Sequence, residues 1–119
     1  MGLLVIAVTL ALGGSVFAQG RTDVVTLSNG DRLTGEVIRL ERGRLEFKTD
    51  DAGTLYLEWD KLGSLVAARQ FEVGTTDGRR FLGTLAPSAT RSITIVGPQG
   101  SGALPMNEVT SITPIGRSG

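Results

Sequence analysis

The chain contains one β unit twice, and this duplication constrains its fold more than any other feature. The turn glycines Gly30 and Gly78 are 78 − 30 = 48 residues apart, and apolar residues match apolar residues at the same offset. Such matching is typical of a duplicated packed unit, because inward positions are kept in register while polar ones drift. At offset 48 the matched pairs are Val25 and Val73, Leu33 and Phe81, Gly35 and Gly83, Val37 and Leu85, Leu45 and Ile93, and Phe47 and Ile95. After one deletion, at offset 47, they are Gly53 and Gly100, Leu57 and Leu104, Trp59 and Met106, Leu62 and Val109, and Leu65 and Ile112.

Both copies have the pattern of short β-strands separated by turns. Apolar and polar residues alternate over short runs, and no 3.6-residue apolar period persists after the N-terminal segment. Asn29-Gly30 and Asp77-Gly78 predict two hairpins with type I′ turns. Gly35 and Gly83 occupy matched places inside a long second strand, where they predict a bend or a bulge.

A unit of four or five strands must bend strongly to enclose a core. The sequence therefore predicts an all-β protein of two tandem SH3-like or Sm-like barrels, residues 19–69 and 70–115, or two bent sheets packed as one sandwich. Residues 116–119 are expected to be a disordered tail. The predicted core consists of alternating apolar side chains from both copies: Leu33, Val37, Phe47, Leu57, Trp59, Phe81 and Ile95.

The N-terminal segment has the pattern of an export signal. Residues 3–12 are almost entirely apolar, and the first charged residue is Arg21. The small residues Val16 and Ala18 fit a signal-peptidase site, so cleavage is expected between Ala18 and Gln19. Such an apolar run is too short to span a bilayer comfortably. We therefore expect residues 1–18 to be removed and the rest to be periplasmic or secreted.

Composition argues against several kinds of chemistry. The chain has no Cys and no His, so it has no thiol nucleophile, disulfide or imidazole base. Lys and Arg total 12, as do Asp and Glu, so no net positive field draws the chain to nucleic acid or to an anionic membrane surface. We expect neither nucleic-acid binding nor stable membrane insertion after cleavage, and no cofactor.

Few residues are candidates for chemistry. Asp50, Asp51 and Asp60 lack the ligand spacing of a calcium site and are interpreted as solvated turn residues. The stretch 97–102 lacks the lysine and the strand–loop–helix context of a phosphate loop and is interpreted as a turn. The basic residues cluster near turns and are interpreted mainly as charge-paired surface, but they are also the candidates for a partner-binding loop: Arg42, Arg44, Arg79 and Arg80.

Several stretches resemble a known family. The run VTLSNGDRLTGEV at 25–37 looks like the opening of an Sm-like fold, and it resembles the periplasmic N-terminal region of the salt-induced outer-membrane proteins (domain of unknown function 481). The resemblance continues through residues 48–54, 58–62, 71–73, 77–78 and 83–87. This resemblance implies a location in the cell envelope and a small β-barrel fold of the Sm-like kind. Family members continue into a C-terminal membrane barrel, and no such barrel is expected within these 119 residues.

Together these observations predict a non-enzymatic envelope module. We expect it to bind a protein partner, or copies of itself, through sheet edges and loops. Association with an outer-membrane protein is compatible with this hypothesis. One alternative is a truncated or split outer-membrane protein without its barrel, and another is an accessory hydrolase or carbohydrate-binding domain.

Overall fold

The computed structural model describes residues 22–116, so the predicted signal peptide and residues 117–119 lie outside the described part. The described chain is all-β, as predicted, with two short 3₁₀ turns, η3 and η4. The elements are β2 (Asp23–Leu27), β3 (Arg32–Glu41), β4 (Arg44–Thr49), β5 (Thr54–Glu58), η3 (Trp59–Lys61), β6 (Leu62–Thr75), β7 (Arg80–Ala86), β8 (Ser92–Gly97), β9 (Gly100–Pro105), η4 (Met106–Glu108) and β10 (Val109–Pro114). No helix in residues 22–116 is long and apolar enough to cross a membrane.

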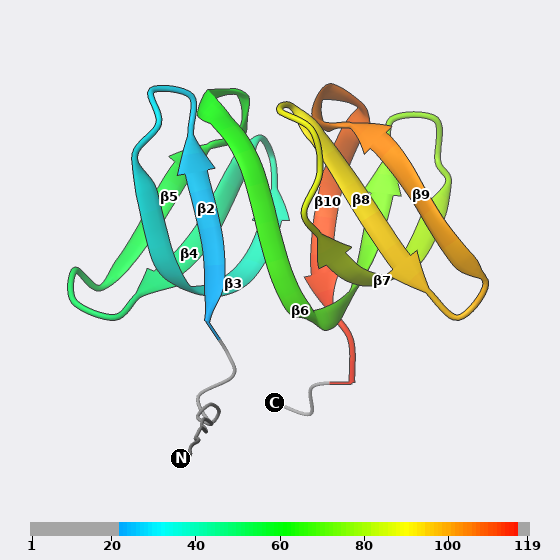
Figure 1. The fold of residues 1–119 in the computed structure, drawn as a ribbon, viewed down its shortest axis with the longest axis horizontal. Helices are drawn as coiled ribbons and strands as arrows, with labels where there is room; N and C mark the ends of the chain where they lie inside the picture. Colours follow the sequence, from blue (N-terminus) through cyan, green and yellow to red (C-terminus); the bar gives the residue numbers. More distant parts are fainter. Residues whose placement is uncertain (1–21, 117–119) are drawn as a thin grey trace, which may run out of the picture.

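All the strands belong to one antiparallel sheet. Its order is β5-β4-β3-β10-β6-β7-β8-β9, and β2 pairs with both β3 and β6. Strands β2, β3, β10 and β6 therefore close a four-stranded barrel in the middle of the molecule. The hairpin β4–β5 extends this barrel on one side and strands β7, β8 and β9 extend it on the other, so β5 and β9 lie at opposite ends (Figure 1).

The pairing registers repeat from one copy to the other. The pair Val25 and Leu65 in the first copy corresponds to Val73 and Ile112 in the second. The β-hairpins agree in the same way, since Val25 pairs with Leu33 and Val73 pairs with Phe81. In each copy a 3₁₀ turn also comes directly before the last strand. The duplication seen in the sequence is thus a duplication of strand pairing.

The two copies share a strand instead of being joined by a linker. Strand β6 runs for 14 residues, from Leu62 to Thr75. Its first half ends the first copy and its second half begins the second, so the division drawn between residues 69 and 70 falls inside a strand. The copies also pair with each other, through Ile112 with Leu40 and Ala67 with Leu85.

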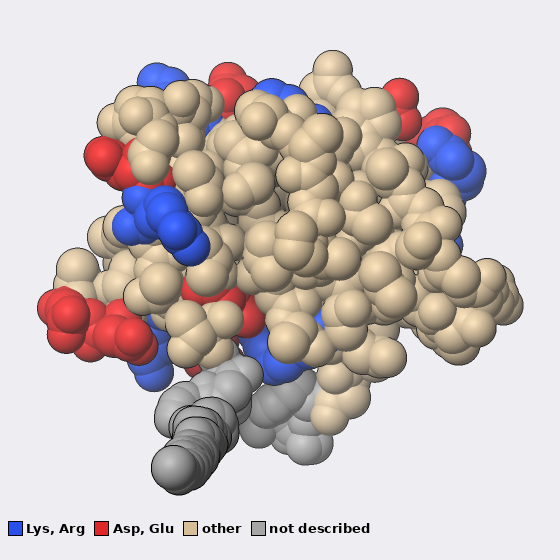
Figure 2. Space-filling model, viewed as in Figure 1, with Lys and Arg blue, Asp and Glu red and all other residues tan. Residues whose placement is uncertain are grey.

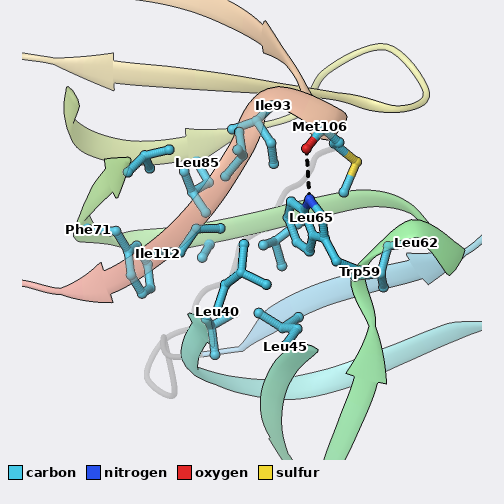
Figure 3. Close-up of a cluster of buried hydrophobic side chains, with 14 of the residues drawn as sticks. Leu40, Leu45, Trp59, Leu62, Leu65, Phe71, Leu85, Ile93, Met106 and Ile112 are labelled. Atoms are coloured by element: carbon cyan, nitrogen blue, oxygen red, sulfur yellow. Dashed lines mark hydrogen bonds between the residues drawn. The ribbon is translucent and has the colours of Figure 1, made fainter. Parts of the chain in front are cut away.

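A single hydrophobic core joins the copies (Figure 3). Of the residues predicted to form it, Val37, Phe47, Trp59 and Ile95 are buried. The side chains of the other predicted core residues are partly buried and pack against its margin: Leu33, Leu57 and Phe81. Strand β5 ends at Glu58, and Trp59 begins η3.

The turn types differ from the predicted ones. A type I′ turn needs positive φ at both central residues. At the two predicted sites only the glycines have it, with φ of 97° at Gly30 and 87° at Gly78. The Gly30 N–H donates to the Leu27 carbonyl at 2.9 Å, as in a type I turn followed by a left-handed glycine. The two-residue turn with positive φ at both positions is instead Arg42-Gly43, at 56° and 76°.

Candidate functional site

The first notable region is the seam between the copies, which we define as η3, η4 and the β3–β4 turn. The indole Nε1 of Trp59 donates a hydrogen bond of 2.8 Å to the carbonyl of Met106, its match in the other copy (Figure 3). The two residues are also held alike by backbone bonds. The Trp59 N–H donates to the Gly43 carbonyl and the Met106 N–H donates to the Arg91 carbonyl, both at 2.9 Å. Each copy thereby positions the residue that contacts the other.

Arg91 fastens the second copy to the first. Its Nη1 donates to the carbonyls of Trp59, at 3.1 Å, and of Leu62, at 2.8 Å. Its backbone has a φ of 65°, at the place where the first copy has Gly43. The guanidinium caps carbonyls at the two ends of η3, and these hydrogen bonds compensate for the strained backbone. Sequence reasoning passed over Arg91, although it is the one charged residue between Phe81 and Asn107.

Arg42 and Arg44 lie at the β3–β4 turn, on the surface of the seam. They line a shallow hollow of about 620 Å³ together with Glu58, Asp60, Arg91 and Asn107. Arg44 forms an exposed ion pair with Glu58, with Nε and Oε2 3.6 Å apart. Acidic and basic groups are interleaved here, so the hollow does not have the one-sided charge of an anion site.

Arg79 and Arg80 line a different hollow, so the structure does not bring the four predicted arginines into one site. Arg79 pairs with Asp77 at 2.9 Å and with Glu108 at 3.7 Å, and Arg80 pairs with Glu72 at 3.0 Å. Hydrogen bonds from the Thr75 hydroxyl and then from Arg79 lower the pKa of the exposed Asp77 to about 2. These arginines are therefore already engaged with acidic neighbours.

The hollow beside Arg79 and Arg80 measures about 530 Å³ and belongs to the second copy. Strands β7, β8 and β9 and the β8–β9 turn form its walls. The turn is Pro98-Gln99, and Gly97 pairs with Gly100 on its two sides, so the predicted turn at 97–102 continues into β9. The lining is largely apolar or glycine backbone and includes Phe81, Leu82, Ile95, Leu104 and Gly102.

A buried carboxyl group, that of Asp23 at the start of β2, lies beside Arg69 of β6. Asp23 is buried, and its Oδ2 accepts a 2.8 Å hydrogen bond from the Val37 N–H and lies 3.6 Å from Nη2 of Arg69. Arg69 also donates to the Val37 carbonyl at 2.6 Å, and its guanidinium lies over the Phe71 ring. Oδ1 of Asp23 and Nε of Arg69 have no partner. Burial raises the pKa of Asp23 above its ordinary value, against the Val37 and Arg69 interactions.

This raised pKa predicts a pH dependence of stability. The pKa of Asp23 is higher in the folded protein than the unfolded value of 3.8. The protonated carboxyl group therefore contributes fully to the free energy of unfolding below pH 3.8, and this contribution is lost as pH rises through the folded-state pKa. Asp23→Asn keeps an acceptor for the Val37 N–H and removes the titration. Urea unfolding of both proteins from pH 3 upward should show that the stability of the native protein relative to Asp23→Asn falls as pH rises. A constant difference would contradict a raised pKa.

The predicted carboxylate candidates do not form a site. Asp50, Asp51 and Asp60 are exposed, the first two in the β4–β5 turn and the third in η3. Within residues 22–116, no three Asp or Glu side chains are grouped closely enough to hold a metal ion.

The ends of the sheet are the remaining candidate surfaces. In the described part of the chain, β5 pairs only with β4 and β9 only with β8, so each presents one unpaired edge. Tyr56 of β5 is 63% exposed. Unpaired edges of this kind are templates for strand addition.

Comparison of the chain with protein-family models, curated proteins and solved structures gives no match.

Proposed function

We propose that this protein is an exported, non-enzymatic interaction module that binds a protein partner, or another copy of itself, through the edges of its sheet. The observation that carries the proposal is the topology. A continuous sheet closed in its middle leaves β5 and β9 as two unpaired edges at opposite ends. A rigid barrel with one core can present such edges without unfolding.

The two edges have different surroundings. Outward residues near β5 are charged, with Arg44, Glu46 and Lys48 on the adjoining strand. Strands β8 and β9 and the turn between them carry no charged residue from Ser92 to Pro105, and the surface over them in Figure 2 is mostly tan, with charged side chains at its upper right margin. Charges on and near an edge strand discourage unwanted pairing. The second copy therefore supplies the better protein-binding edge.

The edge proposal can be tested by site-specific photo-crosslinking in the producing cells. A photoreactive phenylalanine analogue replaces Ser101 of β9 or Tyr56 of β5 in the full chain, and the control position is the exposed Glu41 at the end of β3. We expect a discrete adduct from Ser101, and from Tyr56 if both edges are used, with none from Glu41. Adducts at neither edge, or equal adducts at all three positions, would refute edge-mediated binding.

The export part of the proposal rests on the apolar run at 3–12 and on the small residues before Gln19. Cell fractionation followed by intact-mass measurement should find the protein outside the cytoplasm with Gln19 as its first residue. A full-length chain confined to the cytoplasm would refute it. The resemblance to the periplasmic region of the salt-induced outer-membrane proteins supports this location and is part of the proposal.

A further inference from the structure

The two copies differ at one matched inward position beside the sheet edge. In the first copy Phe47 pairs with Leu55, and in the second copy Ile95 pairs with Gly102. Directly paired residues of an antiparallel ladder place their side chains on the same face. Because Ile95 is buried, the missing side chain of Gly102 would point to the core side of the sheet. The second copy therefore lacks an aliphatic side chain that the first copy has at this position.

The space left by that side chain is open. A Cβ placed on Gly102 would meet no atom within 4 Å, and Gly102 lines the hollow of about 530 Å³. Phe81, Ile95 and Leu104 supply apolar walls, and Arg79 and Arg80 already have acidic partners. The hollow therefore suits an uncharged, aliphatic group.

The free edge of β9 lies along the same hollow. Gly100, Gly102 and Ala103 are exposed and have small side chains or none, so another backbone can approach them closely. Strand β9 has no charged residue and no proline before Pro105, the features that usually protect an edge. One ligand could thus occupy the hollow and also form hydrogen bonds with the unpaired backbone groups of β9.

We infer that β9 binds an extended segment of a partner protein, which adds as a strand and inserts one aliphatic side chain where the first copy has Leu55. The first copy shows what fills this position in the same fold, and it identifies the occupant as a leucine-like side chain. This inference rests on the proposed function and specifies its edge, its binding mode and the chemistry of the partner.

The test uses a library of random hexapeptides displayed on phage and selected on the immobilised full chain. We expect enriched peptides to share Leu, Ile, Val or Met at one position within a β-forming sequence. A synthetic enriched peptide should bind Gly102→Leu about tenfold to a hundredfold more weakly, because the new side chain occupies the place of its aliphatic anchor. Thr54→Leu, which places a leucine at an exposed position of the other edge strand, β5, should bind it normally.

Two further measurements test strand addition. Methylating alternate backbone nitrogens of the peptide should abolish binding in one of the two registers, because these N–H groups pair with β9. Hydrogen exchange of residues 100–105 should slow on binding, whereas that of β5 should not change. Should Gly102→Leu fail to fold, the reciprocal variant Leu55→Gly, which opens the matching space beside β5, should gain binding of the same peptide.

The outcomes separate this inference from the proposed function. Selection without an aliphatic consensus, or equal peptide binding by Gly102→Leu, would overturn the inference while leaving crosslinking at the edges intact. A native dimer that Gly102→Leu converts to a monomer, measured by light scattering, would identify a second copy as the occupant and overturn the assignment to a separate partner. Failure of crosslinking at both edges would overturn the proposed function itself.

Discussion

Replacing Trp59 with alanine is expected to lower the free energy of unfolding by about 3–5 kcal/mol, the usual cost of truncating a large buried aromatic residue. Trp59 is 6% exposed and packs in the core shared by the two copies. The substitution also removes the hydrogen bond from the indole N–H to the Met106 carbonyl, which keeps the Val109 N–H as its other donor. Because Trp59 packs between the two copies, the loss of its side chain should destabilise both of them.

A second variant separates packing from hydrogen bonding. Trp59→Phe keeps an aromatic ring but removes the indole N–H, so it should cost about 1–3 kcal/mol, from the loss of one buried hydrogen bond together with a small cavity. Urea denaturation followed by circular dichroism measures both variants. One cooperative transition is expected for each, since the copies share β6 and one core. Two separate transitions in the native protein would show that the copies unfold independently.

Replacing Gly35 or Gly83 with alanine should be as damaging, at about 3 kcal/mol or more, because the added methyl group meets backbone that cannot rotate away. A Cβ on Gly35 would lie 2.1 Å from the Lys48 carbonyl oxygen, and one on Gly83 would lie 2.4 Å from that of Val96. Lys48 and Val96 are themselves matched at offset 48. The same close approach of neighbouring strands is therefore built twice.

Gly102→Ala is the matched control, because Gly102 is also a strand glycine but its Cβ position is open. It should be neutral or stabilising by about 0.4–1 kcal/mol, through the reduced entropy of the unfolded chain. Thermal and urea unfolding of the three alanine variants would compare them directly. If Gly35→Ala were as stable as Gly102→Ala, close backbone approach would not be the reason for glycine at position 35.

Much of the fold was predictable because its signals are local. Alternating apolar residues identify strands, and the matching of Val25 with Val73 and of Phe47 with Ile95 identifies the copies. The same locality explains the errors. Asn29-Gly30 predicts a hairpin correctly, but the type of turn depends on how the flanking strands pair. A strand as long as β6 looks like two elements when the sequence is divided by its repeats.

The candidate surfaces were less predictable, because they depend on residues distant in the sequence. The four arginines chosen from sequence lie around two separate hollows, and nothing local to Arg42 or Arg79 indicates this. Arg91 had a weak signal, as an isolated charge in a neutral stretch and the match of Gly43. Its role became apparent only when its guanidinium was placed against η3 of the other copy.

Short-range alternation and self-similarity are properties of the sequence, and the all-β class, the two matched copies and the inward-facing positions in each copy follow from them. The sharing of β6, the closure of one barrel and the contact between Trp59 and Met106 depend on residues distant in the sequence, so they are seen only in the folded chain. The same is true of Gly102. In the sequence it is a glycine at the position of a leucine, but in the edge strand β9 it leaves a hollow.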